Sequence, residues 1–172
     1  MNVIKKKEMS LVRYISDLHF HHRNMAIKRG FIDEHNMNEY IVSQWNKTVS
    51  KRDVTWILGD ITMEKDNYDI LDRLNGYKKV ILGNHDKPQH VRSLLRHVNS
   101  IQSMKYVQDK EFGKSILTHA PIHPCELEYR WPINIHGHVH ENTLEDKRYI
   151  NVCAEAIDYK PKTLAELYGE SR

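Results

Sequence analysis

The segment Lys79–Asp86, which reads KVILGNHD, shows the pattern on which the rest of the chain is built. Its apolar run Val80–Leu82 is rich in β-branched residues and predicts a strand that is buried on both faces. Gly83 allows a sharp turn after this strand, and an amide, an imidazole and a carboxylate follow directly. Because ligands of open α/β sheets bind at the carboxyl ends of the strands, we expect a functional site at this turn.

Four other strand-like runs end in the same way. They cover residues 11–15, 54–58, 115–117 and 133–135, and they lead respectively into DLH at 17–19, GD at 59–60, a histidine at 119 and HGHVH at 136–140. Any one of these endings would be an ordinary polar turn. All of them together predict that His, Asp and Asn side chains gather in one site.

Taken in chain order, these endings match a family signature. The motifs D-x-H, G-D, G-N-H-D, an isolated His and G-H-x-H are present in full at 17–19, 59–60, 83–86, 119 and 137–140. In these motifs the chain resembles the calcineurin-like metallophosphoesterases. It is most similar to the small single-domain bacterial and phage phosphoesterases, which carry a Trp-Asn pair such as Trp45-Asn46 after the first motif. The resemblance extends from about residue 14 to the C-terminus.

The periodicity of the sequence predicts an α/β fold with a mixed sheet, since strand–loop–helix units fill the first half and strands the second. The resemblance implies a narrower architecture, a four-layer αββα sandwich of two mixed β-sheets flanked by helices. Helices are expected over residues 36–49, with Asn36 or Asn38 as the N-cap, over 68–74, over 88–95, and after Thr163 in a capping box with Glu166. Residues 20–24 are expected to form a polar loop, and Trp45 to lie in the core.

The resemblance implies a dinuclear metal centre. One divalent ion would be held by Asp17, His19, Asp60 and His140, and the other by Asp60, Asn84, His119 and His138, with Asp60 bridging the two. Mn²⁺ is the expected metal, and Fe, Zn²⁺ or Ni²⁺ accept the same carboxylate and imidazole ligands. The spacing of the residues alone supports only a part of this ligand assignment. Residues two apart in an extended backbone point the same way, so each D-x-H or H-x-H pair can reach one ion.

The resemblance also implies a mechanism of phosphate ester hydrolysis. A hydroxide that bridges the two ions would attack phosphorus, because two divalent ions lower the pKa of the water between them. His85 would act as the general acid that protonates the leaving oxygen, and Asp86 would orient its imidazole. A small phosphodiester, such as a nucleotide, is the expected substrate.

Residues after the first motif are candidates for substrate contacts, together with one metal ligand. The candidates are His22, Arg23, Asn24 and Asn84. A solvated loop residue is at least an equal interpretation of His22, and it is the favoured interpretation of Arg23 and Asn24. His136 forms a second H-x-H frame with His138, but the glycine places the family motif at 137–140, so a structural role is expected for His136.

Composition limits the remaining possibilities. The 172 residues are expected to form one domain, residues 1–172, with residues 1–9 as a flexible N-terminal segment. The net charge of +3 is small and the basic residues are dispersed, which argues against binding of long nucleic acids. No segment has the character of a membrane span or a signal peptide. Cys125 and Cys153 lack metal-ligand spacing, so reduced thiols in a cytoplasmic protein are expected.

Three alternatives stand beside the small-molecule phosphodiesterase. A nuclease of the same superfamily would be expected to carry a basic, aromatic face or an added binding domain, and the sequence has neither signal. A phosphomonoesterase differs only in its substrate, which no motif specifies. A protein-binding scaffold with this fold would have degraded metal motifs, whereas every motif position is intact here. The sequence carries no signal for the oligomeric state.

Overall fold

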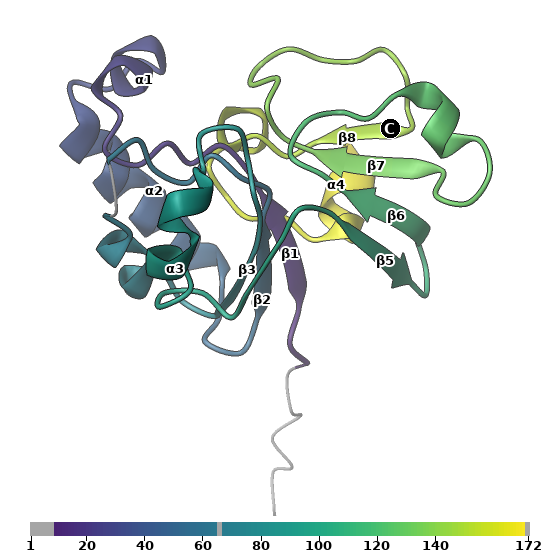
Figure 1. Cartoon of the computed structure of the whole chain (residues 1–172), viewed down its shortest axis with the longest axis horizontal. Coiled ribbons are helices and arrows are strands. Elements are labelled where there is room, and N and C mark those ends of the chain that lie inside the picture. The colour runs from purple at the N-terminus through teal and green to yellow at the C-terminus, as the bar shows by residue number, and fades with distance from the viewer. Residues whose placement is uncertain (1–8, 65–66, 171–172) are drawn as a thin grey trace, which may run out of the picture.

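The computed structural model describes residues 9–64 and 67–170. The predicted α/β class is confirmed, because helices accompany two four-stranded sheets (Figure 1). The flexible segment expected over residues 1–9 lies outside the described residues, apart from Met9, which is exposed.

The first sheet consists of parallel strands. In spatial order it contains β1 (Val12–Ile15), β2 (Val54–Ile57), β3 (Tyr77–Ile81) and β4 (Ser100–Gln102). Most side chains of the first three strands are buried, as expected for strands that are covered on both faces. Because these strands run in the same direction, their carboxyl ends meet at one edge of the sheet, where the first three motifs follow.

The second sheet is mixed. It contains β5 (Lys105–Asp109), β6 (Gly113–Leu117), β7 (Ile133–His136) and β8 (Tyr149–Asn151) in that order. β5 and β6 form an antiparallel hairpin, whereas β6, β7 and β8 are parallel to one another. The histidine motifs that follow β6 and β7 therefore also emerge at one edge.

The two sheets adjoin where β1 ends. The N–H of Ser16 donates to the carbonyl of Val152 at 2.8 Å, and the N–H of Ala154 donates to the carbonyl of Ser16 at 2.9 Å. The segment after β8 thus pairs with the segment after β1. This seam brings the carboxyl ends of the strands of both sheets to a common region.

Helices cover the first sheet on its outer side. They are α1 (Arg23–Lys28), α2 (Glu34–Thr48) and α3 (Val91–Leu94), and they lie on the side of this sheet away from the second sheet (Figure 1). α4 (Leu164–Glu170) packs near β1. Short 3₁₀ helices cover residues 69–73, 88–90, 124–127 and 154–157. None of the helices in the described part of the chain is long and apolar enough to cross a membrane.

Three of the helix predictions need correction. α2 begins at Glu34 because Asp33 is its N-cap, with its carboxylate accepting the N–H of Asn36 at 2.7 Å. Asn38 is buried instead, and its side-chain oxygen accepts the N–H of His21. Residues 23–28, expected within or beside a polar loop, form α1, which buries one side chain and is too short for its periodicity to be recognised. Residues 69–73 form a 3₁₀ helix.

The C-terminal capping box is confirmed. The N–H of Glu166 donates to the Thr163 hydroxyl at 3.3 Å, and the N–H of Thr163 donates to the Glu166 carboxylate at 2.7 Å. These reciprocal hydrogen bonds satisfy two donors that the start of α4 would otherwise leave unpaired.

The Trp-Asn pair ties α2 to the turn before β3. Trp45 is fully buried, which confirms its predicted place in the core, and its indole N–H donates to the carbonyl of Asn75 at 3.0 Å. Asn46 accepts the N–H of Asn75 at 2.8 Å and donates to the carbonyl of Arg73 at 2.9 Å. The pair is therefore a structural anchor that fixes where β3 begins.

Candidate metal centre

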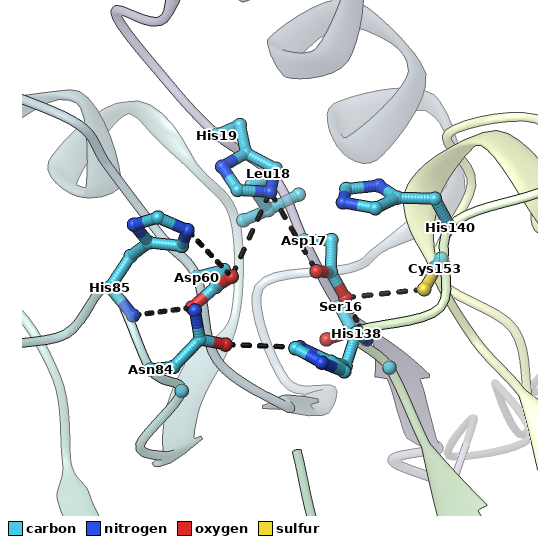
Figure 2. Close-up of polar contacts among 12 residues, drawn as sticks. Ser16, Asp17, Leu18, His19, Asp60, Asn84, His85, His138, His140 and Cys153 are labelled. Atoms are coloured by element: carbon cyan, nitrogen blue, oxygen red, sulfur yellow. Dashed lines mark hydrogen bonds and ion pairs between the residues drawn. The ribbon is translucent and has the colours of Figure 1, made fainter. Parts of the chain in front are cut away.

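Two groups of potential metal ligands lie at the common edge. The buried group consists of Asp17, His19 and His140, and the open group consists of Asp60, His119 and His138. Within each group, one ligand atom from each residue lies within 4.8 Å of the others. Figure 2 shows side chains from both groups turned towards one another, although they come from distant parts of the chain.

The backbone at these ligands differs from the expected extended form. Asp17, His19, Asp60, His138 and His140 have φ angles of 56, 48, 53, 71 and 55°. The left-handed region is uncommon for residues with a side chain and is typically found where function requires it. The prediction that D-x-H and H-x-H pairs point the same way along a strand was therefore wrong in its geometry. The ligands converge because each follows a strand in a tight left-handed turn.

Backbone hydrogen bonds hold these turns against one another. The N–H of Asp17 donates to the carbonyl of Gly59, and the N–H of His19 donates to the carbonyl of Asp60, both at 3.0 Å. Gly137 approaches the first motif so closely that a Cβ there would collide with Ser16 and Asp17. The glycine of the last motif is thus required by contact with the first motif.

The buried group contains polar atoms that lack partners. Asp17 is fully buried and His19 is 2% exposed. Oδ1 of Asp17 lies 3.7 Å from Nε2 of His19, and neither atom has a hydrogen-bond partner among the described residues. Leaving such atoms unsatisfied in the interior is unfavourable by about 1–3 kcal/mol per group. A cation placed between the carboxylate and the imidazole would satisfy both, so these residues fit a metal ion.

The second oxygen of Asp17 has partners in the sheet seam. Oδ2 accepts the N–H of His138 at 2.8 Å and the thiol of Cys153 at 3.2 Å (Figure 2). Burial alone would raise the pKa of Asp17, but the neighbouring polar groups of His19, Ser16 and His138 hold it well below its ordinary value. The carboxyl group is therefore ionised, as a metal ligand must be.

A side-chain amide lies between the two histidines of the open group. Nδ1 of His119 donates to the carbonyl of Leu58 at 2.7 Å, and because a carbonyl can only accept, Nδ1 carries the proton. Nε2 of His119 then faces the side-chain oxygen of Asn84 at 2.8 Å, and Nδ1 of His138 faces the same oxygen at 3.0 Å. Asn84 therefore belongs with this group, and both Asn84 and His138 are exposed.

Asp60 lies between the two groups. Its Oδ2 is 3.8 Å from Nε2 of His19 in the buried group and 3.5 Å from Nε2 of His119 in the open group. Its Oδ1 accepts the N–H of His85 at 2.9 Å. One carboxylate oxygen thus faces ligand atoms of both groups, while the other is fixed by the backbone.

His85 lies beside the open group with its ring exposed. Its Nε2 is 3.9 Å from Oδ2 of Asp60 (Figure 2). The expectation that Asp86 orients this ring was wrong. The Asp86 carboxylate accepts the N–H groups of Asp60, Ile61 and Gly83 at 2.8–3.1 Å, so its hydrogen bonds within the described residues go to backbone groups. Asp86 therefore fixes the two loops that carry Asp60 and His85.

The candidate substrate residues after the first motif separate in space. The ring centroid of His22 lies 5.5 Å from that of His19, and burial, together with neighbouring imidazoles, lowers the pKa of His22. Arg23 and Asn24 are exposed in the first turn of α1, and within the described part of the chain neither forms a hydrogen bond or ion pair with the ligand groups. His136 is buried, contacts the carbonyl of Gly137 through Nδ1, and belongs to neither ligand group.

Sequence reasoning missed three residues that support the buried group. Cys153 contacts Asp17, Glu155 contacts His140, and Arg29 contacts Glu155. None of the three belongs to a motif, and a single sequence contains no signal that relates them to ligands elsewhere in the chain. Only the seam between the sheets brings them to the site.

The fold and the two ligand groups define an α/β protein whose His and Asp residues could hold metal ions. No family model matches the chain. The uncharacterized protein MJ1445 of Methanocaldococcus jannaschii is 31% identical over 169 residues, which cover 91% of this chain and 88% of that protein. The chain belongs to the same protein family as MJ1445.

Two further proteins are similar over most of their length. The gene 66 protein of Mycobacterium phage D29 is 28% identical over 180 residues, covering 86% of this chain and 89% of the phage protein. The crystal structure of the protein of unknown function AQ665 from Aquifex aeolicus matches with a TM-score of 0.75 and 26% identity, over 94% of this chain and 100% of that one. The Aquifex protein thus shares this fold over its whole length.

Proposed function

We propose that this chain is a dinuclear metal-dependent phosphoesterase of the calcineurin-like type. The observation that carries the proposal is the place of Asp60, whose Oδ2 faces His19 of the buried group and His119 of the open group at 3.8 and 3.5 Å. An ionised carboxylate suits this place because its oxygens carry negative charge and no proton, so they can face two cations at once. The proposal includes the αββα arrangement within a single domain, supported by the helices outside the first sheet (Figure 1).

Each of the two ligand groups would hold one of the two ions. The buried group with Asp60 would hold one divalent ion, and the open group with Asn84 the other; Mn²⁺ is proposed, with Fe, Zn²⁺ and Ni²⁺ as alternatives. Two divalent ions held side by side would supply a clamp for a phosphoryl group and lower the pKa of a water molecule between them. The buried atoms without partners, Oδ1 of Asp17 and Nε2 of His19, support the first of these ion sites.

His85 is proposed to protonate the leaving oxygen. Its backbone N–H is held by Asp60, so the exposed ring stays beside the ligand groups without belonging to either. A donor in that place contributes about 10²–10⁴-fold to the rate when the leaving group is poor. His22, half-buried near His19, is proposed to contact the substrate from the other side.

The proposed substrate is a small phosphodiester such as a nucleotide. The open group, Asn84 and His85 reach the surface, so an ester can approach from the side of His138 and Asn84. We propose no long nucleic acid as substrate, because the net charge is only +3. Phosphomonoester cleavage is the alternative that the test below distinguishes.

The test compares two chromogenic esters after removal of metal. The purified chain is treated with a chelator, Mn²⁺ is added back, and hydrolysis of bis-p-nitrophenyl phosphate and p-nitrophenyl phosphate is measured. We expect turnover of the diester that depends on added Mn²⁺ and is the faster of the two. His138→Ala should abolish it, whereas His136→Ala, the matched change in the neighbouring frame, should have a milder effect.

Each other outcome changes the proposal. Faster turnover of the monoester would make the protein a phosphomonoesterase. A larger effect of His136→Ala than of His138→Ala would show that the metal ligands come from the H-x-H pattern that begins at His136 and not from the one that begins at His138. Binding of Mn²⁺ without hydrolysis of either ester would contradict the phosphoesterase proposal for these substrates and favour the scaffold.

A further inference from the structure

Arg29 and Glu155 form a buried ion pair beside the buried group. Nη2 of Arg29 lies 2.7 Å from Oε2 of Glu155, and their side chains are only 3% and 13% exposed. The two residues are 126 positions apart in the sequence, Arg29 at the end of α1 and Glu155 after β8. A buried pair of this kind rarely adds stability compared with apolar side chains of the same volume, because both charges lose their hydration.

Glu155 uses its other oxygen on a candidate metal ligand. Oε1 lies 2.7 Å from Nδ1 of His140. Because an ionised carboxylate only accepts, Nδ1 of His140 carries the proton, and Nε2 is left without one on the side of Asp17 and His19. The ring of His140 is stacked near that of His19, with centroids 5.3 Å apart and 23° between the planes (Figure 2). Glu155 therefore selects both the tautomer and the direction of the His140 ring.

Arg29 holds the other side of the same group. Nη2 donates to the carbonyl of Asp17 at 2.7 Å, and Nη1 donates to the carbonyl of Leu18 at 3.2 Å. These carbonyls belong to the left-handed turn that presents Asp17 and His19. A guanidinium group suits this task because its donors are fixed in one plane, whereas a lysine offers a single charged point.

One guanidinium group thus contacts both halves of the buried group. It binds the backbone that carries Asp17 and His19 directly, and it binds the carboxylate that orients His140. The first and last motifs lie on different sheets, so their spacing depends on what spans the seam. Outer hydrogen bonds of this type orient metal-binding histidines, and their loss typically weakens metal affinity about 10–100-fold.

We propose that Arg29 and Glu155 are positioning residues that set the geometry and affinity of the ion site formed by Asp17, His19 and His140. The inference rests on the proposed function, since it requires that the buried group holds a metal ion. It goes further in assigning one of the two ion sites a dedicated ion pair as its support. The pair contacts neither substrate nor ion.

The experiment measures Mn²⁺ binding rather than turnover. Metal-free full-length wild type and the variants Glu155→Ala, Glu155→Gln and Arg29→Lys are titrated with Mn²⁺ by calorimetry, and the bound ions are followed by electron paramagnetic resonance. The matched control is Arg73–Glu39, an ion pair with the same 2.7 Å contacts whose side chains are 49% and 44% exposed. Arg73→Lys and Glu39→Gln change the same chemistry on the outside of the first sheet.

We expect wild type to bind two ions with the resonance of a coupled pair. Glu155→Ala should weaken one ion about 10–100-fold, leave the other within about twofold, and give the signal of an isolated Mn²⁺. Glu155→Gln should recover part of the affinity, because its amide oxygen accepts the same hydrogen bond from His140. Arg29→Lys should weaken the same ion, and both control variants should match wild type.

Several results would overturn the inference. Unchanged affinity for both ions in Glu155→Ala would remove the positioning role, as would an equal loss in the control variants. If Glu155→Ala does not fold, wild-type binding by Glu155→Gln together with Arg29→Lys would have the same meaning. A different result would contradict the proposed function, namely a wild-type chain that binds neither ion. If wild type and every variant bind two ions with the same affinity, only the role of Arg29 and Glu155 is contradicted.

Discussion

The two ligand groups are supported in opposite ways. In the buried group, Asp17 and His19 are shielded from solvent, and the carboxylate of Glu155 backs His140. In the open group, His119 is backed by the neutral carbonyl of Leu58, and His138 meets an amide at the surface. The charged support thus lies behind the more buried of the two groups. We infer that the buried group has a structural share in the site and that the open group meets the ester.

The largest effect is expected where the two groups meet. Asp60→Asn would replace the oxygen that faces both groups by an amide that cannot carry the negative charge. We expect both ions to be weakened and turnover of the diester to fall by roughly 10³-fold or more, since each ion contributes several kcal/mol. Calorimetric titration with Mn²⁺ and steady-state kinetics measure the two effects. Selective loss of a single ion would assign Asp60 to one group alone.

The second effect separates proton donation from metal binding. His85→Ala removes the exposed ring beside the open group and leaves both ligand groups intact. We expect unchanged Mn²⁺ binding, a loss of about 10²–10⁴-fold with an alkyl leaving group, and little loss with p-nitrophenolate, which needs no proton. Kinetics on a matched pair of diesters provides the measurement. Equal slowing of both diesters would exclude His85 as the proton donor.

A third substitution tests the metal affinity of the open group, in the same way that Glu155→Ala tests the metal affinity of the buried group. Asn84→Ala removes the amide oxygen that faces His119 and His138. We expect one ion to be weakened by roughly 10–100-fold and the ion of the buried group to be retained. The double variant with Glu155→Ala should then lose both ions, and the calorimetric losses should add because the two changes act on different groups. Loss of both ions in Asn84→Ala alone would mean that the groups are not independent.

The smallest effect concerns pH and the metal-free protein. The hydrogen bond from Glu155 raises the pKa of His140 above its usual value, and the pKa of Glu155 is lowered by His140 and Arg29 against the opposing effect of burial. The raised pKa of His140 stabilises the fold below its unfolded value of about 6.5, and this contribution is lost as pH rises through the folded value. The lowered pKa of Glu155 contributes above about 4.3 and is lost as pH falls.

The interaction between Glu155 and His140 therefore stabilises the metal-free fold most between pH values of about 4.3 and about 6.5. We expect thermal denaturation in a chelator to show a decline in stability as pH rises above about 6.5. Glu155→Gln should flatten this decline. Glu39→Gln, which alters the exposed pair, should leave it in place. A decline of the same size in Glu155→Gln would assign the pH dependence to other groups.

Much of the fold could be predicted because apolar runs and capping patterns are local. The runs that end at Gly83 and Gly59 were recognisable as buried strands, and Thr163 with Glu166 as a capping box. α1 could not be recognised, since six residues with one buried side chain leave no periodic signal. Asp33 was missed as the cap of α2 because Asn36 and Asn38 are equally good caps by composition.

The candidate ligands were predictable, but their support was not. Motif spacing and the family resemblance named the residues of both groups, because these lie directly after strands. The role of Asp86 depends on which N–H groups surround its carboxylate, and three backbone donors occupy it. Arg29, Cys153 and Glu155 act across the seam between the sheets, and a single sequence does not reveal which distant residues meet there.

The seam also determines when the site can form as the chain is made. Asp17 and His19 are synthesised early, whereas His140 and Glu155 follow more than a hundred residues later. The late residues reach the early ones only after the segment that follows β8 pairs with the segment that follows β1. The emerging chain can complete the parallel strands of the first sheet while this half of the site is still unfinished. An ion held by the buried group would therefore be captured late in assembly, and its binding would report that both sheets have joined.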